Sequence, residues 1–248
     1  MAALRASDDR PASGISGDSA SISAPPAPVI VIGFLGGFVR HDDGVHIEVS
    51  MAQRLQTDYA GDVRVATFEN RRRDDAHKLI LRLLAAGRDT NPTLAQKRAA
   101  RIILYGHSWG ASAVVDLARA LDRDGIPVLL TVQVDSVAKI GQNDADIPDN
   151  VAHAANFYQT KGFVHGQSRI RAVDPARTDI LGNFLFDYSA KPISCPKFPW
   201  YDRVFMRSHI EIECDPNVWQ KVGSLIREQL PASPQTARSD SPAATAQN

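Results

Sequence analysis

The feature that most constrains this chain is a regular alternation of apolar, β-branched runs with amphipathic stretches at helical spacing. The strand-like runs are PVIVIGFLGG (28–37), DVRVATFEN (62–70), ARIILYGHS (100–108) and IPVLLTVQVDS (126–136), and the helix-like stretches between them are 47–60, 75–87 and 110–125. Strands that alternate with helices of this length form β-α-β units on a parallel sheet. The sequence therefore predicts an α/β fold with a mostly parallel central sheet and helices on both faces.

The pattern is looser after Asp135. Residues 151–159 and 180–189 read as further strands, the second of them as a strand or one arm of a hairpin. Residues 215–230 begin with Asp and Pro and carry apolar side chains on one helical face, which predicts a last helix.

Both ends of the chain differ in composition from the middle. Residues 1–27 and 231–248 are rich in Ala, Ser, Pro and Asp and poor in large apolar side chains. Such segments do not bury enough apolar surface to offset the entropy of ordering. We therefore expect a single folded domain over 28–230 between two disordered ends.

Composition excludes several classes of partner. The 248 residues carry no formal net charge, with 44% hydrophobic and 23% charged residues, so nothing favours nucleic acid or an anionic membrane. No apolar run approaches the roughly 20 residues of a membrane helix, and the N-terminus lacks the apolar core of a signal peptide. A cytoplasmic location is the default expectation.

The chain has two cysteines, Cys195 and Cys214. They could form a disulfide, but two cysteines in a chain of this size are more often free thiols, which is the expectation here.

The motif Gly106-His107-Ser108-Trp109-Gly110 lies where a predicted strand ends and a predicted helix begins. A serine on such a strained turn needs small neighbours, because the turn brings backbone and adjacent elements close together. This context resembles the nucleophile elbow of the α/β-hydrolase superfamily, in particular its lipase-like and thioesterase-like members. The resemblance covers most of residues 28–230 and implies that Ser108 is a nucleophile.

The resemblance also implies an order of serine, acid and histidine along the chain. His209 follows all predicted core strands and is expected in a loop before the last helix, in the segment SHIEIECDPNVW. We therefore expect His209 to be the base. His107 sits in the elbow itself and is not expected to serve also as the base.

The acid has three candidates. Asp135 ends the strand that follows the elbow helix, at the edge of a parallel sheet where such sites assemble. Asp174 lies in an Asp-Pro turn, and Asp187 has no clear position at a strand end. Asp135 is the expected acid, with Asp174 and Asp187 left open.

An oxyanion hole needs two backbone N–H donors. The residue after the nucleophile, Trp109, is one expected donor. The loop after the first strand, IGFLGG, should supply the other, with Phe34 expected first and Leu35 next. Superfamily members often carry a His-Gly pair in this loop, whereas this chain has Ile32-Gly33, which leaves the support of the loop in question.

No metal or organic cofactor is expected. His41, Asp42, Asp43 and His46 are possible ligands, but their spacing matches no closed zinc site, and Asp43 is a natural N-cap for the next helix.

These features predict a serine hydrolase that cleaves an ester or thioester through an acyl-enzyme. Two alternatives stay open: an acyltransferase with the same triad, and a non-catalytic binding protein with the same fold. The expected cap segments, 139–150 and 160–180, are polar, which tilts the expected substrate toward shorter or polar acyl groups. Acyl specificity and oligomeric state are not determined by the sequence.

Overall fold

The computed structural model describes residues 29–61, 63–86 and 91–232. Its centre is a six-stranded sheet with the strand order β2-β1-β3-β4-β6-β8. Every neighbouring pair in this sheet is parallel. The strands are β1 (Val29–Leu35), β2 (Val63–Glu69), β3 (Arg101–His107), β4 (Val128–Val134), β6 (Val151–Tyr158) and β8 (Asp179–Leu185).

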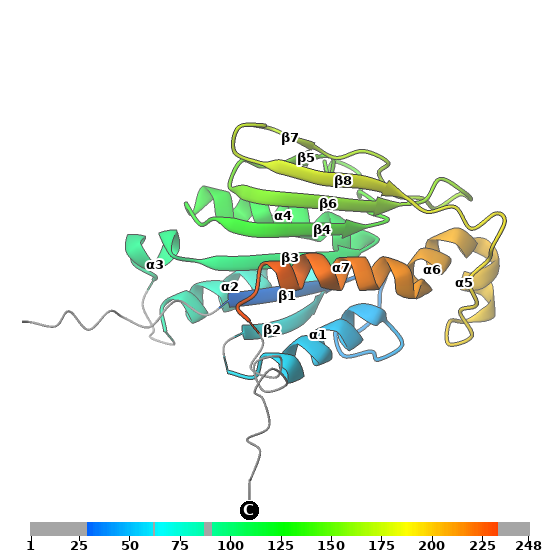
Figure 1. Cartoon of the computed structure of the whole chain (residues 1–248), viewed down its shortest axis with the longest axis horizontal. Helices are drawn as coiled ribbons and strands as arrows, with labels where there is room; N and C mark the ends of the chain where they lie inside the picture. The colour runs from blue at the N-terminus through cyan, green and yellow to red at the C-terminus, as the bar shows by residue number, and fades with distance from the viewer. Residues whose placement is uncertain (1–28, 62, 87–90, 233–248) are drawn as a thin grey trace, which may run out of the picture.

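Helices cover both faces of this sheet (Figure 1). One face carries α1 (Ile47–Asp58) and α7 (Pro216–Glu228), and the other carries α2 (Arg73–Leu84) and α4 (Trp109–Arg123). The predicted α/β architecture, a mostly parallel sheet with helices on both faces, is confirmed.

The alternation of side chains along β1 explains the two layers. Ile30 and Ile32 pack into the apolar cluster that includes α2 and α4, whereas Val29 and Val31 pack into the cluster that includes α1 and α7. Successive residues of a strand point to opposite faces, so a central strand must be apolar throughout. Full burial of each such side chain contributes about 1.5–3 kcal/mol.

Shorter elements complete the chain after the central strands. They are η1 (Asn70–Arg72), α3 (Leu94–Arg98), β5 (Asp146–Ile147), β7 (Arg171–Ala172), α5 (Trp200–Phe205) and α6 (Arg207–Cys214). β5 and β7 pair in parallel as a small second sheet, inside the region that the sequence left irregular. β8 pairs in parallel with β6, so it is a strand of the main sheet and not a hairpin arm.

The single domain expected over 28–230 stays a prediction. The segments expected to be disordered, 1–27 and 231–248, lie outside the described residues apart from 231–232. Among the described helices, none has the length and apolarity needed to cross a membrane.

The expectation for the cysteines is wrong. Cys195 and Cys214 form a disulfide, with their Cα atoms 5.8 Å apart. The bond joins the segment after β8 to the end of α6, because the chain between them turns back through α5. The number of cysteines in a sequence does not show whether two of them lie close together in the fold. The expected cytoplasmic location stays a prediction.

Candidate active site

Ser108 occupies a sharp turn between β3 and α4. Its backbone has φ 56° and ψ −128°, a conformation that side-chain-bearing residues rarely adopt. The Ser108 N–H donates to the carbonyl of Val134 at 3.0 Å, and this bond ties the turn to the end of β4. Figure 1 shows the arrowheads of β3 and β4 at the same end of the sheet as α6. The strained turn presents the Ser108 hydroxyl at that end.

The glycines on either side of Ser108 are required by close backbone contacts. A Cβ added to Gly106 would lie 2.7 Å from the carbonyl carbon of Gly110, and one added to Gly110 would overlap the Phe34 carbonyl. The small residues of the motif therefore let α4 approach β1 and β3 behind the serine.

The structure brings His209 to Ser108. The two atoms Nε2 of His209 and Oγ of Ser108 are 2.9 Å apart, and both side chains are buried. His209 lies in α6 and not in the loop that we expected. The alternation of Ile and Glu in HIEIE has a period of two, which hid this short helix in the sequence.

Asp135 holds the other side of the His209 ring. Its Oδ2 lies 2.6 Å from His209 Nδ1 and also accepts from Gln159 Nε2 at 2.8 Å. Its Oδ1 accepts the backbone N–H groups of Gly166 at 2.7 Å and Gln159 at 3.4 Å. The carboxylate is fully buried, and these donors supply the hydrogen bonds that a buried charge needs.

The two competing acids have other partners. Asp174 accepts the N–H of Ala176 at 2.9 Å, and Asp187 accepts the N–H of Ser189 at 2.9 Å. Both side chains therefore stabilise turns in their own segments, as the Asp-Pro turn at Asp174 predicted.

The charges around the ring favour a neutral imidazole beside an ionised acid. Burial lowers the pKa of His209 below its usual range, and the charge of His107 lowers it further, while the hydrogen bond with Asp135 opposes both. Burial alone would raise the pKa of Asp135, but the hydrogen bond and charge of His209 bring it below its usual value. In this state Nδ1–H of His209 donates to Asp135, and Nε2 accepts from the Ser108 hydroxyl.

In the loop after β1, Gly36 is the residue whose backbone faces Ser108. A Cβ added to Gly36 would lie 2.8 Å from Ser108 Cβ. Phe34, our expected donor, lies inside β1 and is registered against both Phe68 and Gly106, so its backbone belongs to the sheet. Trp109 is the first residue of α4, where N–H groups have no acceptor within the helix.

Asn70 supports this loop. Its amide group donates to the carbonyls of Leu35 at 3.2 Å and Gly37 at 2.6 Å, and its oxygen accepts from Lys139 Nζ at 2.6 Å. This support was not predicted, since the His-Gly pair of the superfamily is missing from the loop. Asn70 follows β2, so only the pairing of β1 with β2 brings it to the loop.

A buried cluster of charged groups lies behind the His209 ring. Glu213 Oε2 is 3.1 Å from His107 Nδ1, and Glu213 Oε1 is 2.6 Å from His46 Nδ1. The charge of Glu213 overcomes the effect of burial and raises the pKa of His107 to about 9. Despite burial, the charge of His107 and the two hydrogen bonds lower the pKa of Glu213 to about 2. Glu213 was not predicted as part of the site, because it is distant from His46 and His107 along the chain.

Of the histidine and acids that we weighed as metal ligands, only His46 belongs to this cluster. Asp42 pairs with Arg40, and Asp43 accepts the N–H of Val45. The predicted N-cap role of Asp43 is wrong, because α1 begins one turn later with His46 at the N-cap position.

His46, Glu48 and Glu213 could offer ligand atoms within 4.8 Å of one another. Both oxygens of Glu213 already face imidazole nitrogens, and a metal ion would lie beside the positive charge of His107. Glu213 therefore belongs to an ion-pair network with His46 and His107, whereas the carboxylate oxygens of Glu48 have no hydrogen-bond partner among the described residues. Burial, together with the charge of Glu213, raises the pKa of Glu48 to about 7.

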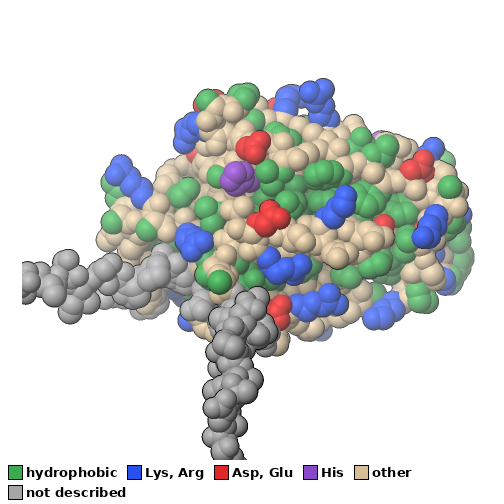
Figure 2. Space-filling model, viewed as in Figure 1, with side chains coloured by type: hydrophobic (Ala, Val, Ile, Leu, Met, Phe, Trp, Pro, Cys, Tyr) green, Lys and Arg blue, Asp and Glu red, His purple; other side chains and the backbone are tan. Residues whose placement is uncertain are grey.

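The segment between β8 and α6 exposes apolar side chains. On α5, Trp200 is 65% exposed and Phe205 is 68% exposed. Figure 2 shows hydrophobic and basic side chains together at the end of the molecule where α5 and α6 lie. The polar segments 139–150 and 160–180 are therefore not the only surface near the strand ends. The expected preference for shorter or polar acyl groups stays a prediction.

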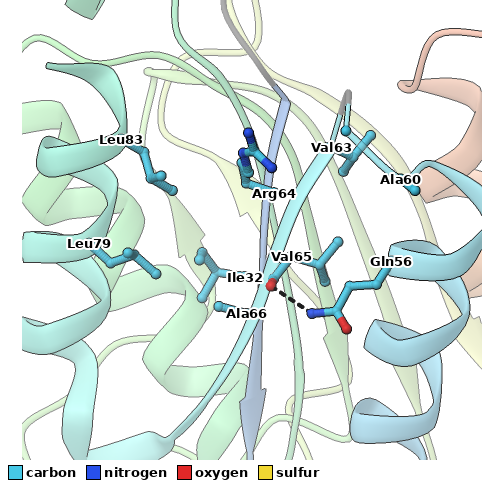
Figure 3. Close-up of a pocket in the computed structure, with 10 residues that line it drawn as sticks. Ile32, Gln56, Ala60, Val63, Arg64, Val65, Ala66, Leu79 and Leu83 are labelled. Carbon is cyan, nitrogen blue, oxygen red and sulfur yellow. Dashed lines mark hydrogen bonds between the residues drawn. The ribbon is translucent and has the colours of Figure 1, made fainter. Parts of the chain in front are cut away.

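A cavity of about 350 Å³ lies away from these residues, beside the edge strand β2 (Figure 3). Its lining includes Ile32, Val63 and Leu79. Gln56 Nε2 donates to the Val65 carbonyl at 3.0 Å and so covers part of the open edge of β2. None of the lining residues belongs to the Ser108 site.

Comparison with known proteins gives only distant likenesses. No protein-family model and no curated protein matches this chain. Among solved structures, the RedJ thioesterase of the prodiginine pathway of Streptomyces coelicolor is 12% identical, over 77% of this chain and 96% of that one, with a TM-score of 0.36. The type II thioesterase BorB from the borrelidin biosynthetic cluster is 12% identical, over 84% and 95%, with a TM-score of 0.37. A cutinase-like protein from Cryptococcus sp. is 13% identical, over 49% and 60%, with a TM-score of 0.29. Likenesses this distant assign no activity to the chain.

Proposed function

We propose that this protein is a serine hydrolase of the α/β-hydrolase type that cleaves an ester or thioester. One observation carries the proposal: a serine on a strained elbow, 2.9 Å from an imidazole whose other nitrogen lies 2.6 Å from a buried carboxylate. A serine hydroxyl is a poor nucleophile near neutral pH and needs a base to accept its proton. His209 is the proposed base, and Asp135 is the proposed orienting acid.

In the proposed reaction, Ser108 Oγ attacks the carbonyl carbon of the substrate while its proton moves to His209 Nε2. The C–O or C–S bond to the leaving group then breaks, and His209 returns the proton to the departing alcohol or thiol. Water attacks the acyl-enzyme with His209 again as base, which releases the acid and restores Ser108. Asp135 stabilises the imidazolium and keeps the proton of His209 on Nδ1 in the resting state.

The negative charge on the substrate oxygen requires donors that are already in place. We propose the N–H of Trp109 as one donor, as the sequence predicted. For the other we propose Gly36 in place of Phe34, because Gly36 faces Ser108 and lies beyond the end of β1.

The experiment that tests this function is labelling with a fluorophosphonate, followed by peptide mapping of the adduct. We expect one adduct, on Ser108, and loss of labelling in His209→Ala. His165→Ala is the matched control, since this histidine faces the backbone of Gly166 and should leave labelling unchanged. An unlabelled but folded wild-type protein would refute the proposal and favour the binding-protein alternative.

If Ser108 is labelled, a panel of esters and thioesters of graded acyl length defines the substrate. An added acceptor alcohol or amine then separates hydrolysis from acyl transfer.

We expect Gly36→Ala to lower kcat by about 100-fold, since loss of one oxyanion donor typically costs a factor of 10² to 10³. The new methyl group would lie 2.8 Å from Ser108 Cβ and would push the loop away from the serine. Steady-state kinetics with an activated ester measures the effect. Gly44→Ala is the control, because a Cβ there meets no atom within 4 Å. Unchanged kcat in Gly36→Ala would remove Gly36 from the proposed oxyanion hole.

A further inference from the structure

Glu213 and His107 are buried charged groups that the proposed reaction does not use. His107 precedes the nucleophile at the end of β3, and Glu213 follows His209 by about one turn of α6. The side chains of both are 3% exposed, and their closest charged atoms are 3.1 Å apart. A buried carboxylate and a buried imidazole are costly unless they pair, so the pair stabilises His107 as a cation.

The cation lies directly against the proposed base. The ring centroids of His107 and His209 are 4.5 Å apart with an angle of 33° between the planes. Two imidazolium rings at this distance repel each other in a site that excludes water. A charged His107 therefore disfavours protonation of His209.

The surroundings of Glu213 hold this arrangement in place. Its second oxygen pairs with His46 at the start of α1, and its carbonyl accepts the indole N–H of Trp219 at 2.8 Å. The Tyr105 hydroxyl donates to the Glu48 carbonyl at 2.8 Å, which fastens the first turn of α1 to β3. Three elements thus converge on the pair, so that Glu213 cannot move without disturbing them.

The titratable groups around His107 come from three elements. Glu213 and His209 lie on α6, Glu48 lies in the first turn of α1, and Asp135 follows β4. His46, before α1, contacts the other oxygen of Glu213. Glu213 is the acid in direct contact with the His107 ring, and Asp135 is engaged by His209 and Gln159.

We propose that Glu213 is a positioning residue of this site: through His107 it holds a buried cation against the His209 ring and so keeps His209 neutral, ready to accept the proton of Ser108. The catalytic consequence rests on the proposed function, whereas the electrostatic effect on His209 does not.

The test is a pH titration of the His209 ring nitrogens by NMR, in the wild type, Glu213→Gln, His107→Asn and the double variant. His107→Asn removes the neighbouring cation, so the His209 midpoint should rise by about one pH unit. Glu213→Gln should also raise it, because a buried His107 without its counter-ion loses its proton, and this effect outweighs the loss of the direct attraction between Glu213 and His209. The double variant should titrate at or slightly below His107→Asn, because without His107 only that direct attraction is lost.

Glu211→Gln is the matched control on the same helix. Glu211 is buried and pairs with Arg207 at 3.2 Å, so the same substitution there should leave the His209 midpoint in place. If Glu213→Gln does not fold, the rise expected in His107→Asn still tests the effect of the neighbouring cation. A midpoint that does not rise in His107→Asn, or a Glu213→Gln change that shifts the midpoint equally with and without His107, would overturn the proposal.

Fluorophosphonate labelling across the same pH range separates this inference from the proposed function. If His209 shifts as expected but the wild type is never labelled, the positioning role stands and the hydrolase proposal fails. If the wild type is labelled while His209 titrates alike in all variants, the positioning role is refuted. With both correct, the acid limb of labelling moves to higher pH in the two single variants.

Discussion

Ser108→Ala is expected to lower kcat for an activated ester by about 10⁶-fold, the loss typical of removing the serine of such a triad. The nucleophile is absent in this variant, and the residual rate comes only from substrate binding and the oxyanion donors. Stability should change little, because alanine keeps the Cβ that the turn already accommodates. Steady-state kinetics and a thermal melt on the same sample measure both quantities.

Ser112→Ala is the matched control for this prediction. Ser112 lies one turn further along α4 and donates to Gln142 Oε1 at 3.0 Å, so its hydroxyl has a partner away from His209. We expect its kcat to stay within a few-fold of the wild type. A folded Ser108→Ala variant that keeps most of the wild-type activity would show that another group carries the reaction.

The sequence was most informative where one local pattern determines the structure. The alternation of apolar runs with amphipathic stretches predicted the parallel sheet, and β1 illustrates why: its residues are buried on both faces. The turn at Ser108 was also predicted, because a serine between two glycines at the end of an apolar run is typical of a tight strand-to-helix turn. The structure adds that a Cβ at Gly106 or Gly110 would clash with neighbouring backbone. Such features depend on spacing of a few residues and are visible without tertiary information.

Features that depend on distant contacts were missed or misplaced. Glu213 meets His46 only when α6 packs beside the start of α1, 167 positions apart in the chain. The pairing of Cys195 with Cys214 requires the chain to turn back through α5. The loop after β1 is supported by Asn70, which follows the neighbouring strand β2. We propose Gly36 in place of Phe34 as the oxyanion donor, because Phe34 lies within β1 and Gly36 follows its end.

The position of Asp135 depends both on the local strand pattern and on contacts between distant parts of the chain. Its place at the end of β4 was predicted from the strand pattern, but its backbone, with φ 42°, and its partners come from the folded chain. Gly166 approaches so closely that a Cβ there would overlap the Asp135 backbone. The excursion after β6 therefore has a structural purpose: it brings two N–H donors, from Gln159 and Gly166, to Oδ1 of the acid.

Those donors determine the outcome of Asp135→Asn, for which we expect kcat to fall by about 10⁴-fold. Because the N–H groups of Gln159 and Gly166 both point at Oδ1, the amide oxygen of asparagine should take that position. Its NH₂ group then faces His209 Nδ1, which must become an acceptor. The proton of the neutral ring moves to Nε2, and His209 can no longer accept from Ser108.

Asp187→Asn and Asp174→Asn are the controls, since each of these acids stabilises a turn in its own segment. Both should keep kcat close to the wild type, and a thermal melt should confirm that all three variants fold. If Asp135→Asn kept wild-type turnover while either control lost it, the orienting acid would be the residue lost in that control. NMR of the His209 ring adds a check that does not depend on substrate: the proton should leave Nδ1 in Asp135→Asn and stay there in both controls.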